Sequence, residues 1–255
     1  TFGHGLVISG CHGMMGAALL AGEACLRAGA GLTTVHVPRF GNNIIQTALP
    51  EALLSMDQSD ILFSEAPDLE PYSAIGIGPG LGCKSNTSKG LLMLLEKAKV
   101  PLVIDADALN ILSQNPDWYK LIPKGSILTP HPKEFDRLVG TSSEGFERHL
   151  KQKDFAEKYG VIVVLKGAFT GIATPDGRYW FNTNGNPGMA TGGSGDVLTG
   201  LITGLLAQGM KAEDAALCGV YLHGLAGDLA AEASSQEALI AGDILKFIGQ
   251  AFSGV

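Results

Sequence analysis

The sequence predicts an α/β domain in three layers, with a mostly parallel sheet covered by helices on both of its faces. Short apolar runs rich in valine, isoleucine and leucine alternate with segments of helical length along most of the chain. Parallel strands need such long connections, and a sheet buried on both faces is built from continuous apolar runs. With 255 residues, 45% of them hydrophobic and 17% charged, the chain can bury one large core. Because no linker, repeat or low-complexity tract interrupts the pattern, residues 1–255 are expected to form a single domain.

The first two thirds of the chain carry the alternating pattern. GLVISG (5–10) predicts a buried strand, and MMGAALLAGEACLRAG (14–29) predicts a helix that packs through small residues and is closed by Gly29. LTTVHV (32–37) is the second strand. The short apolar runs at 73–78, 101–106, 126–129 and 161–165 predict further buried strands. Helices are expected between them at 85–98, 107–114, 132–139 and 144–159.

The pattern changes after Lys166. TGIATPDGRYWFNT (170–183) has a Pro-Asp-Gly turn between two strand-like arms, which predicts a β-hairpin. A glycine-rich segment follows, and then come helices near 195–208, 212–231 and 242–252.

Composition excludes several classes of partner. The net charge of −7 and the pI of about 5.3 argue against nucleic acid, which is bound through Lys and Arg. No apolar run reaches the roughly 18 residues of a membrane span. The four cysteines form no C-x-x-C pair, so reduced thiols in a cytoplasmic protein are expected. The chain begins at Thr1 rather than Met, so both a trimmed chain and a piece of a longer polypeptide are open.

Unusual loops follow five of the predicted strands. They are GCHGMMGAA, GPGLGCKS, DADALN, PHPKEF and KGAFT, in chain order. Ligands of open parallel sheets bind beyond the carboxyl ends of the strands, so these loops predict one shared cleft. GIGPGLG (76–82) matches neither G-x-G-x-x-G nor the P-loop pattern, and therefore supports neither a Rossmann dinucleotide site nor a P-loop.

NPGMATGGSGDVLTG (186–200) carries the strongest signal of chemistry. Its glycines precede an apolar helical run, and a glycine-rich turn that enters a helix presents free N–H groups to an anion. By position alone, Asp196 is a helix cap or a first-turn acid. A carboxylate beside a phosphate site would repel the phosphate, unless it accepts a proton from a hydroxyl that attacks it. Phosphoryl transfer to a hydroxyl is the reaction that this stretch predicts.

Longer motifs identify a family. NPGMATGGSGDVLTG resembles the G-x-G-D anion-hole signature of the ribokinase-like superfamily. GHGLVISGCHGMMGAALLAGEACLRAGAGLTTV, GIGPGLG, VIDADALN, LTPHPKEFDRLVG and VLKGAFTGIATPDGRYWFNTNGNPGMATGGSGDVLTG together resemble the ADP/ATP-dependent NAD(P)H-hydrate dehydratases. The resemblance runs from about residue 3 to the last helix, and it implies a ribokinase-like α/β/α sandwich. It implies repair of the S epimer of hydrated NAD(P)H, by phosphorylation of the ring hydroxyl and elimination of phosphate.

The resemblance also implies roles for residues at matching positions. Asp196 would be the catalytic base, and the backbone N–H groups of a short turn would hold the phosphoryl group. That turn comprises Gly193, Ser194 and Gly195. The hydrate would be bound by Ala17, Gly80, Gly82, His131 and Asp196. The nucleotide would be bound by Lys166, Gly167, Ala168, Phe169 and Thr170, with Asn186 and Gly195 continuing the site.

Several alternatives accompany these expectations. A small-molecule kinase of the same superfamily, acting on a vitamin precursor or a sugar hydroxyl, is the alternative enzyme, and a nucleotide-sensing module without turnover is the alternative class. Asp105 and Asp107 either bind a metal through water or cap the next helix, and Glu134 is equally explained as a first-turn helix acid. Mg²⁺ is expected with ADP or ATP, and ADP is favoured. Family members are often homotetramers, and many are fused behind an epimerase.

Overall fold

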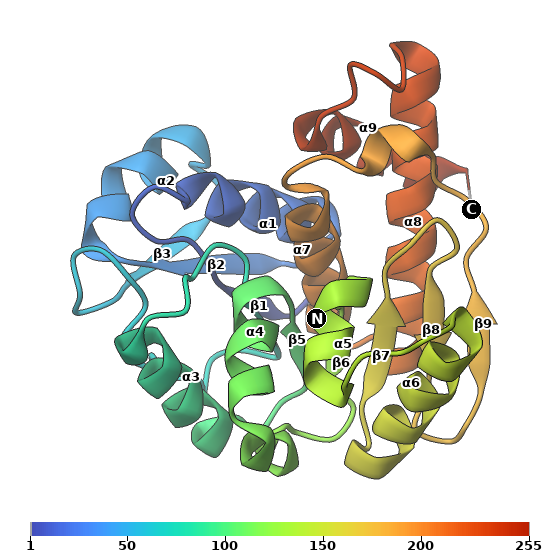
Figure 1. Ribbon diagram of the computed structural model, residues 1–255. Coiled ribbons are helices and arrows are strands. Elements are labelled where there is room, and N and C mark those ends of the chain that lie inside the picture. Colours follow the sequence, from blue (N-terminus) through green and yellow to red (C-terminus); the bar gives the residue numbers. More distant parts are fainter. Residues whose placement is uncertain (1, 255) are drawn as a thin grey trace.

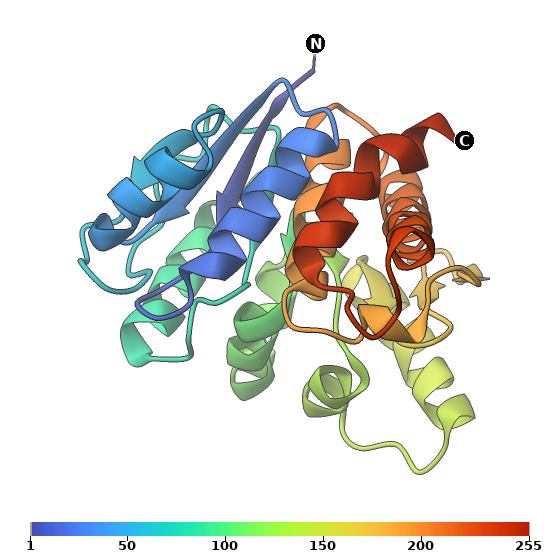
Figure 2. The same ribbon diagram turned by 90° about the horizontal axis from the view of Figure 1, so that it is seen from above.

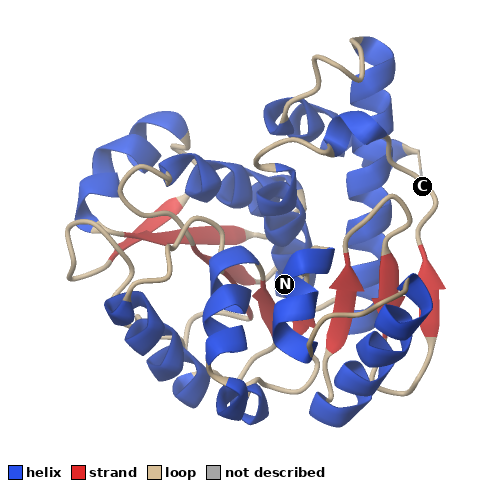
Figure 3. Ribbon diagram, viewed as in Figure 1, coloured by secondary structure: helices blue, strands red, loops and turns tan. Residues whose placement is uncertain are grey.

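The computed structural model describes residues 2–254. Within this range, nine strands form one sheet in the order β3-β2-β1-β4-β5-β6-β7-β8-β9 (Figures 1 and 3). Strands β1 to β7 are parallel, whereas β8 and β9 form an antiparallel hairpin at the end of the sheet. The strands are β1 (His4–Ile8), β2 (Leu32–Val37), β3 (Leu53–Met56), β4 (Ala74–Ile77), β5 (Leu102–Ile104), β6 (Ile127–Leu128), β7 (Ile162–Leu165), β8 (Gly171–Ala173) and β9 (Tyr179–Phe181).

Helices cover both faces of this sheet, as the sequence predicts. One face carries α1 (Met15–Arg27), α7 (Ser194–Ala207), α8 (Ala212–Ala233) and α9 (Ala241–Ser253). The other carries α3 (Ser85–Lys97), α4 (Ala106–Gln114), α5 (Pro132–Val139), α6 (Gly145–Tyr159) and the short η2 (Pro116–Leu121). Successive strand residues point to opposite faces, so Val163 packs with the α3–α6 layer whereas Val164 packs with the α8 layer. Figure 2 shows α1 and α9 side by side on their face.

Helix α7 lies deepest in the molecule. From Val197 to Ala207 every one of its residues is buried, and it packs against α1, α8 and the strands β1 and β4. Glycines allow this close approach to α1, because a Cβ at Gly200 would lie 2.0 Å from the carbonyl oxygen of Ala21. A helix fixed on all sides gives its first turn a fixed position, which matters for the site described below.

The elements predicted from the sequence are confirmed, with boundaries that move by up to a few residues. The segment 38–72 is different, because its sequence predicts no helix or strand. It forms η1 (Arg39–Gly41), α2 (Asn42–Ala48) and the edge strand β3. Edge strand β3 leaves Leu53 and Met56 exposed, so its sequence lacks the continuous apolar run of a buried strand. No helix within residues 2–254 is long and apolar enough to cross a membrane.

Candidate active site

The five unusual loops meet at the carboxyl edge of the parallel strands. The sheet order places β1 between β2 and β4, so the connections after β1 and β4 leave the sheet at a topological switch point. There the backbone N–H of Gly10 donates to the carbonyl of Pro79 over 2.9 Å, and the Ser9 hydroxyl donates to the same oxygen over 2.6 Å. Two of the loops of the predicted shared cleft are therefore hydrogen-bonded to each other.

The glycine-rich segment forms the entry to α7. Gly193 is the N-cap residue, with φ of +90° in the left-handed region that glycine adopts at little cost. Helix α7 begins at Ser194, so Gly195 and Asp196 lie in its first turn. The first-turn N–H groups of a helix have no acceptor inside the helix, and they carry the positive end of its dipole. The first turn of α7 therefore presents N–H groups of the kind that the predicted anion site needs, and the N–H of Ser194 also donates to the carbonyl of Thr191 over 3.4 Å.

A buried ion pair lies directly over this helix terminus. The Nζ of Lys166, at the end of β7, lies 2.7 Å from Oδ1 of Asp105, which follows β5. Asp105 is 1% exposed, and its Oδ2 accepts a 2.8 Å hydrogen bond from the hydroxyl of Thr199 in α7. A Cβ added at Gly195 would lie 3.2 Å from the Lys166 Nζ and 3.4 Å from Asp105 Oδ2. The ammonium of Lys166 therefore stands beside the first turn of α7, held there by Asp105.

Asp105 also caps α4, and the backbone that follows it is strained. Its Oδ1 accepts from the N–H of Ala106 over 2.8 Å. Ala106 has φ of +49° and is the one non-glycine residue in the left-handed region among those described. Strain of this kind persists only where its surroundings hold it, and it clusters at functional sites. Of the two sequence readings of Asp105, helix capping is thus observed, together with the ion pair to Lys166.

Asp196 lies in an environment that favours its protonated form. Burial, first, and the neighbouring carboxylates of Asp105 and Asp107 raise the pKa of Asp196 to about 6, against an opposing effect of Lys166. A carboxyl group whose pKa lies near physiological pH can both accept and release a proton. Perturbed carboxyl groups of this kind mark candidate catalytic residues when they lie in a cleft.

His223, in α8, supports the first turn of α7 from its other side. Its Nε2 lies 3.0 Å from the carbonyl oxygen of Ser194 and 3.3 Å from the Ser194 hydroxyl. Burial is the main reason that the pKa of His223 falls to about 4, so the ring is neutral at physiological pH. A neutral imidazole that donates to the Ser194 carbonyl fixes the turn without adding charge beside the anion site.

Three of the residues expected to bind the hydrate follow β1 and β4: Ala17 lies in the first turn of α1, and Gly80 and Gly82 lie in the loop after β4. A Cβ at Gly80 would lie 2.9 Å from the Cβ of Ala17 and 3.0 Å from the carbonyl of Met14, so the segments after β1 and β4 are in contact. The N–H of Gly82 donates to Oδ2 of Asp107 over 2.8 Å. Asp107 is therefore used to tie the GPGLG loop to the start of α4.

His131 follows β6 and has a structural role of its own. Its Nδ1 accepts from the N–H groups of Lys133 and Glu134 at 3.1 and 3.3 Å, while Glu134 Oε2 accepts from the N–H of His131 at 2.8 Å. This reciprocal pattern is a capping box, and it explains Glu134 as a helix-capping acid. Because Nδ1 accepts, Nε2 is the ring nitrogen that can donate, and it lies 3.3 Å from Oε1 of Glu134.

The residues expected to bind the nucleotide lie on two different faces of the β7–β9 part of the sheet. Asn186 donates from its amide to Oδ1 of Asp228 in α8 over 2.9 Å, and its side-chain oxygen accepts from Gly188. Asn186 thus belongs to the α8 side. Residues 167 and 169 instead line a cavity on the α6 side. Lys166 lies between the two sides, where its side chain contacts Asp105.

No sequence signal marks three further residues of this region: Thr199, His223 and Asp228. Thr199 lies one turn beyond Asp196 in an apolar helix, and Asp228 has no recognisable spacing. The packing of α7 against β5 and α8 brings Thr199 to Asp105 and His223 to Ser194, whereas Asp228 contacts Gly185 and Asn186.

The carboxylates near the α7 terminus bear on whether Mg²⁺ can be held there, since this ion is commonly held by one or two carboxylates, with water and phosphate oxygens completing its shell. Within residues 2–254, no group of three or more His, Cys, Asp or Glu side chains is arranged to hold a metal ion. Both carboxylate oxygens of Asp105 are already bonded, to Lys166, Ala106 and Thr199, and Oδ2 of Asp107 accepts from Gly82. These two carboxylates therefore fit contact with such an ion through water rather than direct ligation.

Comparisons with known proteins agree with this geometry. The family model for NAD(P)H-hydrate dehydratase matches residues 5–249. The bifunctional NAD(P)H-hydrate repair enzyme of Moorella thermoacetica is 42% identical over 97% of this chain, which covers 48% of that protein. The ADP-dependent (S)-NAD(P)H-hydrate dehydratase of Neisseria meningitidis is 39% identical over 96% of this chain and 83% of its own length. This chain spans about half the length of the bifunctional relatives that it matches.

Solved structures carry the same fold. The ADP/ATP-dependent NAD(P)H-hydrate dehydratase of Bacillus subtilis, crystallised with ATP and Mg²⁺, is 34% identical with a TM-score of 0.87 and covers 100% of this chain and 92% of its own. A ribokinase-like superfamily protein of Enterococcus faecalis gives a TM-score of 0.84 at 31% identity, and the match covers 99% of this chain and 87% of that chain. The ribokinase-like class predicted from the sequence is confirmed. On the family match over residues 5–249, this chain belongs to the NAD(P)H-hydrate dehydratase family.

Proposed function

We propose that this protein restores hydrated NAD(P)H by nucleotide-dependent dehydration of its S epimer. The observation that carries the proposal is the pairing of a helix N-terminus, ready for a phosphoryl group, with a carboxyl group whose pKa is raised to about 6. The names of the relatives in Neisseria meningitidis and Bacillus subtilis support the same substrate.

The first step is phosphoryl transfer to the ring hydroxyl of the hydrate. Asp196 accepts the hydroxyl proton while the hydroxyl oxygen forms a bond to the terminal phosphorus of the donor, whose bridging P–O bond breaks. The N–H groups of Gly193, Ser194 and Gly195 receive the charge that develops on the phosphoryl oxygens, a contribution that is commonly the largest in such reactions. Lys166, held by Asp105 at 2.7 Å, adds a fixed positive charge at the same place.

The second step is elimination. The lone pair of the ring nitrogen assists cleavage of the C–O bond, phosphate leaves with the bonding electrons, and loss of a proton from the adjacent carbon restores the ring double bond. The products are NAD(P)H, phosphate and the donor shortened by one phosphate. Phosphorylation is needed because hydroxide is a poor leaving group, whereas phosphate is a good one.

The hydrate is held, in this proposal, by the loops of Ala17, Gly80, Gly82 and His131. The nucleotide is held by residues 166–170 with Asn186 and Gly195. ADP is the favoured donor, which agrees with the name of the Neisseria meningitidis relative. Asp105 and Asp107 would hold Mg²⁺ through water, and the ion would neutralise charge on the donor phosphates.

Incubation of the purified protein with hydrated NADH and either ADP or ATP tests the proposal. We expect absorbance of reduced nicotinamide to return with both components and not with either alone. A small-molecule kinase of the ribokinase-like superfamily would leave that absorbance unchanged. Failure of both nucleotides to restore it would therefore reject the dehydratase.

The assembly of the protein is a separate proposal. Family membership supports a homo-oligomer, and the bifunctional relatives support a fused or separate partner domain. The family resemblance implies that this partner is an epimerase. The four cysteines are all free thiols, which supports a cytoplasmic location. Light scattering on the purified protein measures its oligomeric state, and the mass of the full gene product shows whether a partner domain is fused to this chain.

A further inference from the structure

Asp228, in α8, is a charged side chain that takes no part in the two proposed reaction steps. Its Oδ2 accepts a hydrogen bond from the backbone N–H of Gly185 over 2.9 Å, and its Oδ1 accepts one from the side-chain amide of Asn186 over 2.9 Å. Hydrogen bonds to a charged group are stronger than those between neutral groups. The carboxylate therefore holds two consecutive residues, at the start of the glycine-rich segment, firmly against α8.

The side chain of Asn186 is oriented by two contacts. Its Oδ1 accepts from the N–H of Gly188 over 3.0 Å and caps the short helix η3 (Pro187–Met189). Its amide nitrogen carries two hydrogens, and the contact with Asp228 uses one of them. The other hydrogen can meet a ligand, and its direction is fixed by Asp228. Asp228 thereby controls the donor group that Asn186 presents to the nucleotide.

Glycines in α8 bring the helix close to the same segment. A Cβ added at Gly224 would lie 2.0 Å from Oδ1 of Asn184, and one added at Gly227 would lie 2.3 Å from Sδ of Met189. A side chain at either position would therefore push the segment away from α8. Because glycine in a helix interior lowers helix stability, two glycines here indicate that close contact with the segment is needed.

Helix α8 also holds the far end of the segment. Nε2 of His223 lies 3.0 Å from the carbonyl oxygen of Ser194, in the first turn of α7. Between the two attachments run residues 187–193, and three of these seven residues are glycine. Backbone rich in glycine has many accessible conformations, so its shape depends on where its two ends are held. Asp228 fixes one end and His223 fixes the other.

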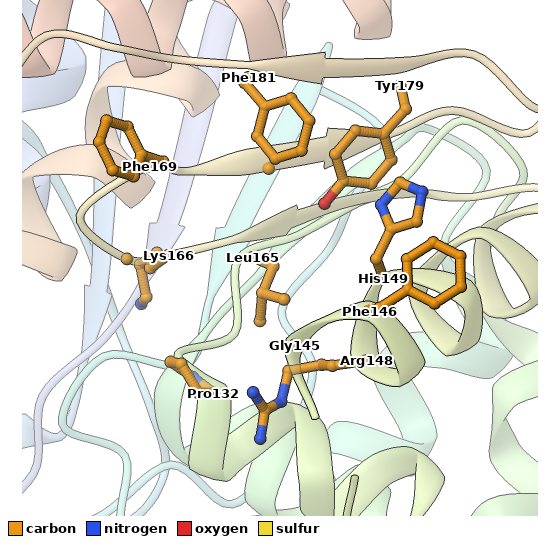
Figure 4. A pocket seen from close by; sticks show the side chains of 12 residues that line it. Pro132, Gly145, Phe146, Arg148, His149, Leu165, Lys166, Phe169, Tyr179 and Phe181 are labelled. Carbon is orange, nitrogen blue, oxygen red and sulfur yellow. The ribbon is translucent and has the colours of Figure 1, made fainter. Parts of the chain in front are cut away.

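The second part of the proposed nucleotide site follows β7. Lys166, Gly167 and Phe169 line a cavity of about 630 Å³ between α6 and the β7–β9 part of the sheet (Figure 4). In the proposed function the donor contacts this segment and Asn186 together, so its affinity depends on the spacing between them. Helix α8 packs against β7, and Asp228 ties Asn186 to α8. The carboxylate of Asp228 thus sets that spacing.

We infer that Asp228 is a positioning residue for the phosphoryl donor. It holds residues 185–186 against α8, so that Asn186 and the segment after β7 keep the spacing that the nucleotide requires. This inference rests on the proposed function for the identity of the donor. In this role Asp228 contacts no substrate itself, and its replacement should change the affinity for the donor without changing the affinity for the hydrate.

The variant Asp228→Asn tests the inference because it keeps the size of the side chain. It replaces one acceptor oxygen by an amide group that donates, so at least one of the two contacts is lost. We expect KM for ADP to rise about tenfold, which corresponds to about 1.4 kcal/mol. KM for hydrated NADH should stay unchanged, and so should kcat at saturating ADP, because His223 still holds the first turn of α7.

The direction of the change separates positioning from charge. Asp228 and the phosphates are both negative, so loss of the carboxylate would strengthen ADP binding if repulsion were its main effect. Asp228→Glu keeps the charge and moves the carboxylate by one methylene, so it should also raise KM for ADP. The matched control is Glu232→Gln, which removes an exposed carboxylate one turn further along α8. It should resemble the parent protein in every measurement, and thermal unfolding shows that each variant is folded.

Calorimetric titration with ADP needs no turnover and separates this inference from the proposed function. Weaker ADP binding by both Asp228 variants, with normal binding by Glu232→Gln, would support the inference even for a protein that repairs no hydrate. Equal or tighter ADP binding by Asp228→Asn would overturn it, even for a protein that repairs hydrated NADH. Equal increases in KM for ADP and for hydrated NADH would overturn it as well, because a general loss of structure would then be the cause.

Discussion

Replacement of Asp196 by Asn should remove the proposed base while leaving the shape of the site unchanged. The pKa of Asp196 is raised from 3.8 to about 6. At pH 7 about nine tenths of the carboxyl groups are then ionised, and at pH 5 about one tenth. General-base catalysis by a positioned side chain contributes about 10²- to 10⁴-fold. At pH 7 we therefore expect kcat to fall at least 10²-fold in the variant.

The pH dependence sharpens this prediction. Because the parent loses its base as the pH falls through 6, its kcat/KM should decline about tenfold per unit below that value. The Asn variant has no such group to titrate, so its residual activity should be nearly flat between pH 5 and pH 8. The ratio of the two rates should consequently shrink by about ninefold from pH 7 to pH 5, following the fraction of ionised carboxylate.

The assay follows absorbance of reduced nicotinamide from freshly prepared hydrated NADH with ADP, at saturating and at limiting hydrate. Thermal unfolding of each protein at each pH shows that both are folded under the conditions used. A variant that retains a third or more of the parent rate would refute the role of Asp196. A rate ratio that does not change with pH would refute the assignment of the acid limb to this group.

Three further predictions concern the same site. Gly195→Ala places a methyl group 3.2 Å from the Lys166 Nζ, where it should displace the phosphoryl group. We expect kcat to fall by roughly 10²-fold and Tm to stay unchanged or rise. A normal kcat would show that the phosphoryl group does not use this space. Lys166→Met leaves the buried carboxylate of Asp105 without its cation, so the free energy of unfolding should fall by about 3 kcal/mol. Denaturant titration should show that adding Asp105→Asn restores part of this free energy. A further decrease in the double variant would contradict the ion-pair explanation. The pKa of Asp196 is raised on folding, so its carboxyl group favours the native state less and less as the pH rises from about 4 to 6, a loss of up to about 3 kcal/mol. Asp196→Asn should therefore raise Tm at pH 7 with the gain vanishing below about pH 4, and an equal Tm at pH 7 would mean that the pKa is not raised.

Much of the fold could be predicted because each local pattern agreed with the final structure. The strand at 32–37 is predicted to the residue, since LTTVHV is a short run rich in β-branched residues between glycine and proline. The hairpin followed from its Pro-Asp-Gly turn. The helix and the strand within residues 42–56 could not be predicted, because a short helix and an edge strand carry little apolar periodicity of their own. Their stability comes from packing against α1 and β2, which is a tertiary property.

The candidate site likewise has a local part that the sequence predicts and a long-range part that it does not. The glycines and Asp196 are local, because a helix N-terminus and its first-turn acid occupy consecutive positions in one segment. The ion pair of Lys166 with Asp105 spans 61 positions, and the contact of Asp105 with Thr199 spans 94. No spacing rule connects such residues. They meet only because β5 and β7 lie on either side of β6 and α7 packs against β5.

By itself, the sequence determined the layers of the fold and, through its long motifs, the family, and it predicted phosphoryl-transfer chemistry. The tertiary structure decided which side chains surround Asp196, since burial and the carboxylates of Asp105 and Asp107 raise its pKa. It also decided that the rings of Phe146 and Phe181, from a helix and a strand 35 positions apart, face one cavity. Local hydrogen bonds and propensities can be read along the chain, whereas burial and electrostatic coupling depend on every element that packs around a group.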